Sequence, residues 1–257
     1  MRVLVVGAGN MVESILTGLS AEGATVNDLS SWGIVSKSGV SAKRLAEKFG
    51  LHYLEKLSDF PNPEWILLGL KPQQLKEITI PDFPVMSLLA AIPEKSQKEM
   101  LKVSHLVRVM PNLPVAYRSG VTLMSSSSKA HLKMPEELFS QLGLVKVLPE
   151  KELEELTLLT GSGPALFYEF AKTLALSFES LTETEREDLV KAVLTGSAAS
   201  VGKDSLSQMI RNVTSKGGVT IAVLEEWRNK NLDEVLKAGV MNGIKRTQQL
   251  KALLLQN

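Results

Sequence analysis

Two glycine-rich stretches of this chain carry residue types that bind anions through the polypeptide backbone. The first, GAGNM at 7–11, lies between an apolar run, RVLVV, and a helix-like pattern, MVESILTGLS. The second, VTSKGGVT at 213–220, interrupts a helical sequence, because each of two adjacent glycines costs about 1 kcal/mol in a helix interior. Amides at the beginning of a helix point outward, and the helix dipole favours negative charge there. Both stretches are therefore candidate sites for a phosphate or a carboxylate.

The first stretch has the sequence context of a dinucleotide-binding turn. Gly7 allows a sharp turn from strand to helix, and Gly9 lets backbone amides approach a pyrophosphate. Val12 stands where the motif has its third glycine, so the motif is incomplete, and an ordinary strand–helix turn is the alternative. We predict that a dinucleotide cofactor binds at Gly7, Ala8, Gly9, Asn10 and Met11.

The end of the second predicted strand bears on which dinucleotide binds. The sequence WGIVSKSG has Ser36 and Lys37 where an NAD-dependent dehydrogenase usually has the acidic residue that holds the ribose 2′-hydroxyl. Hydroxyl groups and a cation suit a 2′-phosphate, whereas a solvated loop lysine is the alternative interpretation. The pattern favours NADPH, with NADH as the second choice.

The first 150 residues alternate short apolar runs with helix-like stretches. Several runs are continuously apolar, as expected for strands covered on both faces. We predict strands at 2–6, 32–35, 65–70, 85–90, 106–110, 121–124 and 145–148. The alternation predicts an α/β fold, a Rossmann-type doubly wound domain with a mostly parallel sheet over residues 1–150. Lys71 and Pro72, in GLKPQQ, end the third strand and should face its ligand crevice.

Residues 151–257 have a different pattern. Leu, Ala, Glu and Lys dominate, and apolar residues recur every three or four positions in stretches such as ALFYEFAKTLALSFESL. This spacing predicts an all-helical second domain over residues 151–257.

Composition argues against several other classes of function. The chain has 257 residues, and its formal net charge of +1 gives no basis for binding nucleic acid or a membrane surface. It has no cysteine, and its three histidines, His52, His105 and His131, share no metal-ligand spacing, so we expect no metal site. No apolar stretch approaches the ~20 residues of a membrane span, and the first residues lack a signal-peptide cleavage pattern. We expect a soluble cytoplasmic protein.

Taken in order, the motifs of this chain resemble those of the pyrroline-5-carboxylate reductase family. They are GAGNM at 7–11, KPQ at 71–73, SLLAAI at 87–92, RVMPNLP at 108–114, GSGPA at 161–165 and VTSKGGVT at 213–220. The pairing of GSGPA with VTSKGG is the most specific part. The resemblance implies NAD(P)H-dependent reduction of 1-pyrroline-5-carboxylate to L-proline. It also implies that the helical domain binds the substrate and forms a homodimer, or a larger homo-oligomer.

The resemblance also assigns roles to individual residues. Thr220 is similar to the threonine whose hydroxyl bonds the substrate's ring nitrogen, which makes it the catalytic candidate. Asp204 falls near the position of an acidic residue close to the substrate. Leu70, Ala90 and Asn112 join Lys71 and Pro72 among the cofactor-binding candidates. The substrate carboxylate is expected on the loop formed by Ser215, Lys216, Gly217, Gly218 and Val219, whose successive amides suit an anion.

Five residues depart from the family pattern. Lys216 replaces a proline, Val219 and Leu113 each replace a threonine, and Ala91 and Arg118 each replace a glycine. Leu113 and Val219 keep open the alternative of a paralogous reductase of another cyclic imino acid. A catalytically inactive, cofactor-binding regulatory protein is a further alternative, although the glycine loop and Thr220 are both retained.

Overall fold

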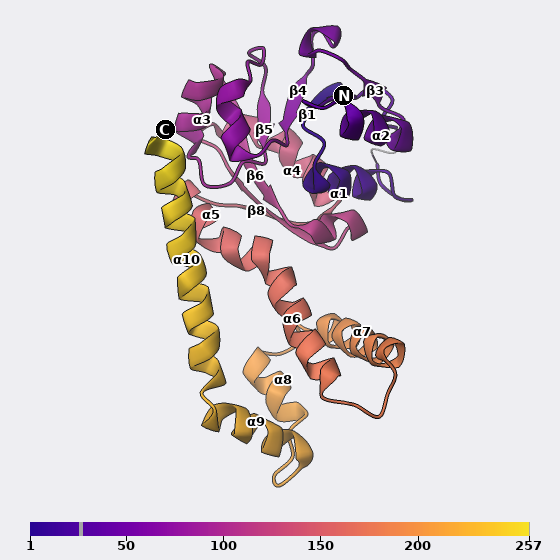
Figure 1. Cartoon of the computed structure of the whole chain (residues 1–257), viewed down its shortest axis with the longest axis vertical. Helices are drawn as coiled ribbons and strands as arrows, with labels where there is room; N and C mark the ends of the chain where they lie inside the picture. Colours follow the sequence, from indigo (N-terminus) through magenta and orange to yellow (C-terminus); the bar gives the residue numbers. More distant parts are fainter. Residues whose placement is uncertain (26–27, 257) are drawn as a thin grey trace. The chain divides into compact units, whose positions relative to one another are not determined.

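The computed structural model describes residues 1–25 and 28–256, and the chain forms two compact units (Figure 1). Unit 1 comprises Met1–Pro164 and Ile244–Asn257, and unit 2 comprises Ala165–Gly243.

Unit 1 is built on one eight-stranded sheet with the order β3-β2-β1-β4-β5-β6-β7-β8. Neighbouring strands are parallel except β6 and β7, which are antiparallel, so the predicted doubly wound, mostly parallel sheet is confirmed. The strands are β1 (Val3–Val6), β2 (Gly33–Val35), β3 (His52–Tyr53), β4 (Trp65–Leu68), β5 (Val85–Ser87), β6 (Leu106–Pro111), β7 (Gly120–Ser125) and β8 (Gly143–Val147).

The strands of unit 1 are apolar because both faces of the sheet are covered. Along β1, Val3 and Val5 belong to one hydrophobic cluster, and Leu4 and Val6 belong to another. The first cluster includes residues of α1 (Asn10–Leu19), α2 (Val40–Phe49) and α4 (Lys133–Ser140). The second includes Leu101 of α3 (Glu94–Leu101) and Leu75 of the 3-10 helix η2 (Pro72–Glu77). Three shorter 3-10 helices are η1 (Leu57–Asp59), η3 (Leu113–Tyr117) and η4 (Lys129–His131).

The helix that follows the first glycine turn is tied to its neighbour by ion pairs. Glu13 of α1 accepts hydrogen bonds from Arg44 at 2.6 Å and Lys48 at 2.9 Å, both on α2. These two bonds, Arg44 first, lower the pKa of Glu13 from 4.5 to about 2. The contribution of these ion pairs to stability is therefore complete above about pH 4.5 and is lost as the pH falls toward 2.

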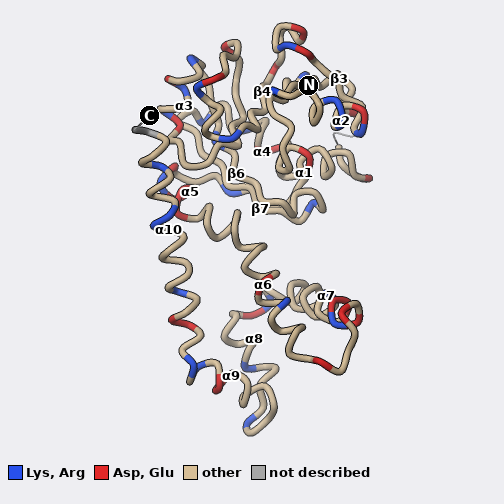
Figure 2. Tube along the Cα trace, in the orientation of Figure 1, with Lys and Arg blue, Asp and Glu red and all other residues tan. Residues whose placement is uncertain are grey.

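Figure 2 shows acidic and basic residues interspersed along the chain.

Unit 1 extends beyond the predicted domain boundary at 150/151. Helix α5 (Glu150–Thr157) begins there, but its Leu153 is fully buried against Met110 and Leu123 of the sheet. The chain continues through a π-helical turn, η5 (Leu158–Ser162), before unit 1 ends at Pro164. The last part of the chain also returns to unit 1, where Leu254 packs against the second cluster. Long-range packing of this kind leaves no mark in the local pattern that suggested the boundary.

The C-terminal part of the chain is helical, as predicted. Its helices are α6 (Gly163–Leu176), α7 (Glu183–Ser200), α8 (Leu206–Asn212), α9 (Val219–Asn229) and α10 (Leu232–Gln256). Thr182 and Glu185 form a capping box at the beginning of α7, and Ser205 accepts a hydrogen bond from the amide of Gln208 in α8. Within unit 2, Ala171 is the one described hydrophobic residue that is buried. Unit 2 on its own therefore has almost no hydrophobic core.

Candidate active site

The first glycine turn requires glycine at position 7. Gly7 has φ +104°, and an added Cβ would lie 2.3 Å from the carbonyl oxygen of Gly69. Its amide donates to the carbonyl of Val35 at 2.9 Å, which joins the turn to the end of β2. The turn predicted from the sequence is thus held by the ends of three neighbouring strands, β1, β2 and β4.

Gly9 is explained differently, because protein packing does not require its missing side chain. It precedes α1 with φ −88°, and an added Cβ would meet no described atom within 4 Å. The space beside the first amides of α1, at Asn10 and Met11, is therefore open to an outside group. Ala8 and Met11 pack their side chains against the first hydrophobic cluster. An open helix N-terminus next to a glycine fits a pyrophosphate.

The structure also shows why Val12 is tolerated at the third glycine position of the motif. Val12 is buried, and a Cβ on Gly69 would lie 2.3 Å from its Cγ2 atom. The close approach of helix and strand end is therefore made possible by glycine at position 69. The missing third glycine does not disrupt the turn.

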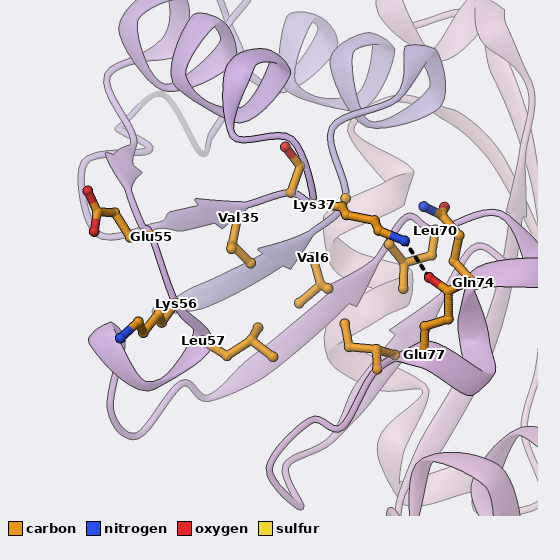
Figure 3. A pocket seen from close by; sticks show the side chains of 12 residues that line it. Val6, Val35, Lys37, Glu55, Lys56, Leu57, Leu70, Gln74 and Glu77 are labelled. Atoms are coloured by element: carbon orange, nitrogen blue, oxygen red, sulfur yellow. Dashed lines mark hydrogen bonds and ion pairs between the residues drawn. The ribbon is translucent and has the colours of Figure 1, made fainter.

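A cavity of about 390 Å³ adjoins the glycine turn at the carboxyl ends of β1, β2 and β4 (Figure 3). Gly7, Ser36, Lys37 and Leu70, all predicted to bind the cofactor, line it. Within the described part of the chain, the Ser36 hydroxyl is buried without a hydrogen-bond partner. Lys37 Nζ lies 2.7 Å from Glu77 Oε2. An unpaired hydroxyl and an ammonium group at one cavity suit a phosphate.

The remaining predicted cofactor residues occupy other positions in unit 1. The Lys71 amide donates to Gln74 Oε1 at 3.0 Å and caps η2, which begins at Pro72. Ala90 lines a second cavity, of about 150 Å³, together with Arg108. The Asn112 side chain donates to the carbonyl of Thr160 at 3.0 Å and accepts from the amide of Val121 at 2.8 Å. Asn112 thus connects its own loop to β7 and to the turn before α6.

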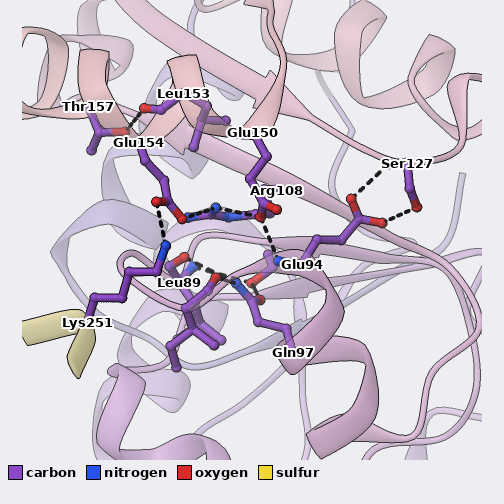
Figure 4. Close-up of polar contacts among 12 residues, drawn as sticks. Leu89, Glu94, Gln97, Arg108, Ser127, Glu150, Leu153, Glu154, Thr157 and Lys251 are labelled. Atoms are coloured by element: carbon purple, nitrogen blue, oxygen red, sulfur yellow. Dashed lines mark hydrogen bonds and ion pairs between the residues drawn. The ribbon is translucent and has the colours of Figure 1, made fainter. Parts of the chain in front are cut away.

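Buried polar side chains shape the loop that carries Ala90 (Figure 4). Gln97 of α3 donates to the carbonyl of Ile92 at 2.7 Å and accepts from the Ser87 hydroxyl at 2.5 Å. Ala91, in this loop, has φ +64°, a left-handed conformation that favours glycine. Arg118 has φ +54°, and it too stands where the family resemblance expects glycine. The left-handed backbone is thus present at both positions although the glycine is absent.

We expect Ala91→Gly to raise the free energy of unfolding by about 0.5–1 kcal/mol, because relief of left-handed strain exceeds the backbone entropy of glycine. Arg118→Gly is the matched variant. It should destabilise the protein, because the Arg118 guanidinium donates to the carbonyls of Gln141 and Glu22. Urea unfolding of both variants measures the difference. A destabilised Ala91→Gly protein would contradict this explanation.

Arg108 is a buried charge that the sequence analysis did not single out. Its side chain is 1% exposed, and Nη1 lies 2.7 Å from Glu150 Oε1 and 3.2 Å from Glu154 Oε1. Lys251 of α10 reaches the other oxygen of Glu154 at 2.7 Å (Figure 4). The four residues join β6, α5 and the end of α10 within unit 1. The sequence feature that could have identified Arg108 is its position as a single charged residue in the apolar strand LVRVM.

In unit 2, the second glycine stretch forms the turn between α8 and α9. Gly217 has φ +69°, whereas Gly218 precedes α9 with φ −85°. The Gly218 amide donates to the carbonyl of Ser215 at 3.0 Å, and a Cβ on Gly218 would lie 2.3 Å from the Ser215 hydroxyl. A positive φ therefore requires glycine at 217, and close packing with Ser215 favours glycine at 218.

The turn presents its residues to solvent at the beginning of an eleven-residue helix. Ser215, Lys216, Gly217, Val219 and Thr220 are exposed, and Val219 and Thr220 are the first two residues of α9. Backbone amides at this position suit an anion, and the Thr220 hydroxyl is available beside them. Asp204 lies in the turn before α8. Among the described residues, no hydrogen bond or ion pair connects Asp204 to 213–220.

Comparison with known proteins shows which proteins this chain resembles. Residues 150–250 match the family model described as pyrroline-5-carboxylate reductase dimerisation. A pyrroline-5-carboxylate reductase of Staphylococcus saprophyticus is 27% identical, and the match covers 98% of each chain. The solved structure of a pyrroline-5-carboxylate reductase from Coxiella burnetii has a TM-score of 0.83 at 25% identity, covering 97% of this chain and 98% of that one. The chain is therefore similar to pyrroline-5-carboxylate reductases along nearly its whole length, and its residues 150–250 match their dimerisation domain.

A further solved structure shares the fold of this chain. It is a Plasmodium falciparum pyrroline carboxylate reductase solved with NADP bound, with a TM-score of 0.80 at 21% identity over 99% of this chain and 98% of that one. The matched range 150–250 contains both GSGPA and the 213–220 loop, the pair of motifs on which the resemblance mainly depended. None of the described helices is long and apolar enough to cross a bilayer. The described residues also contain no group of three or more acidic or histidine side chains that could hold a metal ion.

Proposed function

We propose that this protein reduces 1-pyrroline-5-carboxylate to L-proline with NADPH. The observation that carries the proposal is the turn Ser215–Gly218 followed by Thr220, a helix N-terminus suited to an anion, with a hydroxyl beside it. Similarity to pyrroline-5-carboxylate reductases and the dinucleotide turn of unit 1 support the same reaction. The substrate is a small molecule, and we place the reaction in the cytoplasm.

The residues of unit 1 fit NADPH. The amides that follow Gly9 would hold the pyrophosphate, and Ser36 and Lys37 would hold the 2′-phosphate in the adjoining cavity. When bound, NADPH supplies the hydride that reduces the C=N bond. The NADP-bound relative supports this choice, with NADH as the second cofactor.

The residues of unit 2 fit an imino acid. Amides between Ser215 and Val219, other than that of Gly218, which donates to the Ser215 carbonyl, would bind the carboxylate. Because the backbone would be the ligand, Lys216 in place of proline is compatible with this site. The Thr220 hydroxyl would donate a hydrogen bond to the ring nitrogen, which gains electron density as the double bond is reduced. Thr220 would thereby orient the imine and stabilise the transition state. Asp204, in the turn before α8, remains a candidate substrate-binding residue.

One observation favours a second candidate, a reductase of another cyclic imino acid. Leu113 and Val219 replace threonines of the family pattern, and they are 53% and 84% exposed. Two lost hydroxyls at exposed positions could alter which ring substituents are accepted. Turnover of 1-pyrroline-5-carboxylate compared with that of other cyclic imines distinguishes the two candidates.

We further propose that the protein is an obligate homodimer, and that it can form a larger homo-oligomer. Unit 2 buries little apolar surface by itself, and α6 and α7 line an apolar cavity of about 600 Å³ that includes Phe170 and Val193. A folded domain needs a larger core than this, so a second copy is the natural cover for these side chains. The match of residues 150–250 to a dimerisation domain supports this assembly.

We expect light scattering at micromolar concentration to give at least the mass of a dimer. Val193→Glu should shift the protein toward a monomer, because it places a charge on the apolar surface of α7. Val193→Leu, which keeps that surface apolar, is the control. A wild-type monomer with full activity would contradict the proposed assembly.

A further inference from the structure

We propose that Glu77 sets the cofactor preference of this protein by competing with the 2′-phosphate of NADPH for Lys37. This inference rests on the proposed function, since it concerns the same cofactor site. It assigns a specificity role to a residue outside the glycine turn and outside the end of β2.

The contact is direct and lies at the cavity. Lys37 Nζ is 2.7 Å from Glu77 Oε2, and both residues line the 390 Å³ cavity beside Gly7 (Figure 3). Lys37 is two residues beyond β2, where the 2′-substituent of a bound dinucleotide falls in this fold. In this structure the cation expected to bind the phosphate is therefore already paired with a carboxylate.

Glu77 is held in place by the helix that carries it. It is the last residue of η2, whose Leu75 is fully buried and whose first turn is capped by Gln74 at the Lys71 amide. The helix therefore fixes the backbone of Glu77 at a position from which its carboxylate reaches Lys37. A phosphate that binds Lys37 must displace it or share the cation with it.

The charges decide the direction of the effect. A phosphate monoester carries about −1.5 to −2 charges near pH 7, so a neighbouring carboxylate opposes it, whereas the uncharged 2′-hydroxyl of NADH meets no such repulsion. The Lys37–Glu77 pair is solvent-exposed, with side chains 77% and 57% accessible. Exposed pairs contribute little, so displacement should change affinity only about two- to fivefold. Glu77 thus reduces the NADPH preference and leaves NADH usable.

The test is binding, measured by isothermal titration calorimetry on the full-length protein without substrate. The probes are NADPH, NADH and the fragment pair 2′,5′-ADP and 5′-AMP, which differ by the 2′-phosphate. Glu77→Gln should bind NADPH and 2′,5′-ADP about two- to fivefold more tightly, with 5′-AMP and NADH changed less than about 1.5-fold. The gain should be larger at about 0.1 M than at about 1 M salt.

Two further variants make the result specific. Glu55 lines the same cavity on the side away from Lys37 (Figure 3). Glu55→Gln therefore removes an equal charge and leaves the Lys37–Glu77 ion pair in place. It should change 2′,5′-ADP binding much less than Glu77→Gln does. In a Lys37→Met background, Glu77→Gln should have a smaller effect, because no cation is released and only the repulsion between carboxylate and phosphate is relieved. Two results would overturn this inference but not the proposed cofactor. One is that Glu77→Gln tightens binding of 5′-AMP as much as binding of 2′,5′-ADP, and the other is that it tightens 2′,5′-ADP binding equally when Lys37 is absent. If the wild-type protein binds none of the four probes, both the proposed cofactor and this inference are wrong.

Discussion

Replacing Thr220 with alanine should lower kcat about 5- to 150-fold and change KM less, the equivalent of about 1–3 kcal/mol for one lost hydrogen bond. Thr220 is exposed at the second position of α9, beside the turn proposed to bind the carboxylate. In the proposed site, the bond from the Thr220 hydroxyl to the ring nitrogen would strengthen as that nitrogen gains electron density, so its loss would affect the transition state more than the bound substrate. Steady-state kinetics with 1-pyrroline-5-carboxylate and NADPH measures the split.

Thr220→Ser is the matched control, since it keeps the hydroxyl and should retain most of the turnover. Thermal melting of both variants excludes a general effect on folding. If Thr220 only supported the beginning of α9, Thr220→Ala would lose stability and activity together. A folded Thr220→Ala protein with wild-type turnover would rule out the catalytic role.

Arg108→Met should lower the free energy of unfolding by about 2–3 kcal/mol. The guanidinium is 1% exposed and faces two carboxylates, Glu150 and Glu154, whose side chains are 34% and 24% exposed. Without it, these neighbouring carboxylates lose their buried counter-ion and repel each other. Because both carboxylates still reach water, the loss should fall below the 3–5 kcal/mol typical of a fully buried pair. Urea unfolding at neutral pH gives the value.

Lys251→Met is the matched control for this network. Lys251 pairs with the same Glu154, but its side chain is 35% exposed, so its loss should cost less than about 1 kcal/mol. Equal effects of the two variants would show that burial of Arg108 is not what makes the network important.

The sheet could be predicted from the sequence because its strands have a strong local signal. Residues such as Val3 to Val6 are apolar on both faces, and helices cover both faces of β1. β3 was not predicted, because its two residues are exposed and carry no apolar pattern. The extent of unit 1 was also not predictable, since it depends on Leu153 and Leu254 packing against segments distant in the sequence.

In the candidate site, the positions that require glycine could be predicted from the sequence, whereas the ion pairs could not. The need for glycine at Gly7 follows from the strand–turn–helix pattern, and the structure shows the close approach to Gly69 that requires it. The break at 217–218 was similarly visible in the sequence. The pairing of Lys37 with Glu77, forty residues apart, depends on the order of strands in the sheet. Local spacing contains no such information.

Oxidation of NADPH, followed with 1-pyrroline-5-carboxylate and with a panel of other cyclic imines, decides the proposed function. We expect the highest kcat/KM with 1-pyrroline-5-carboxylate, with L-proline as the product. Preferred turnover of a different cyclic imine would identify the paralogous reductase suggested by Leu113 and Val219. No oxidation of NADPH or NADH with any of these imines, by a folded protein of at least dimeric mass, would contradict the proposed function.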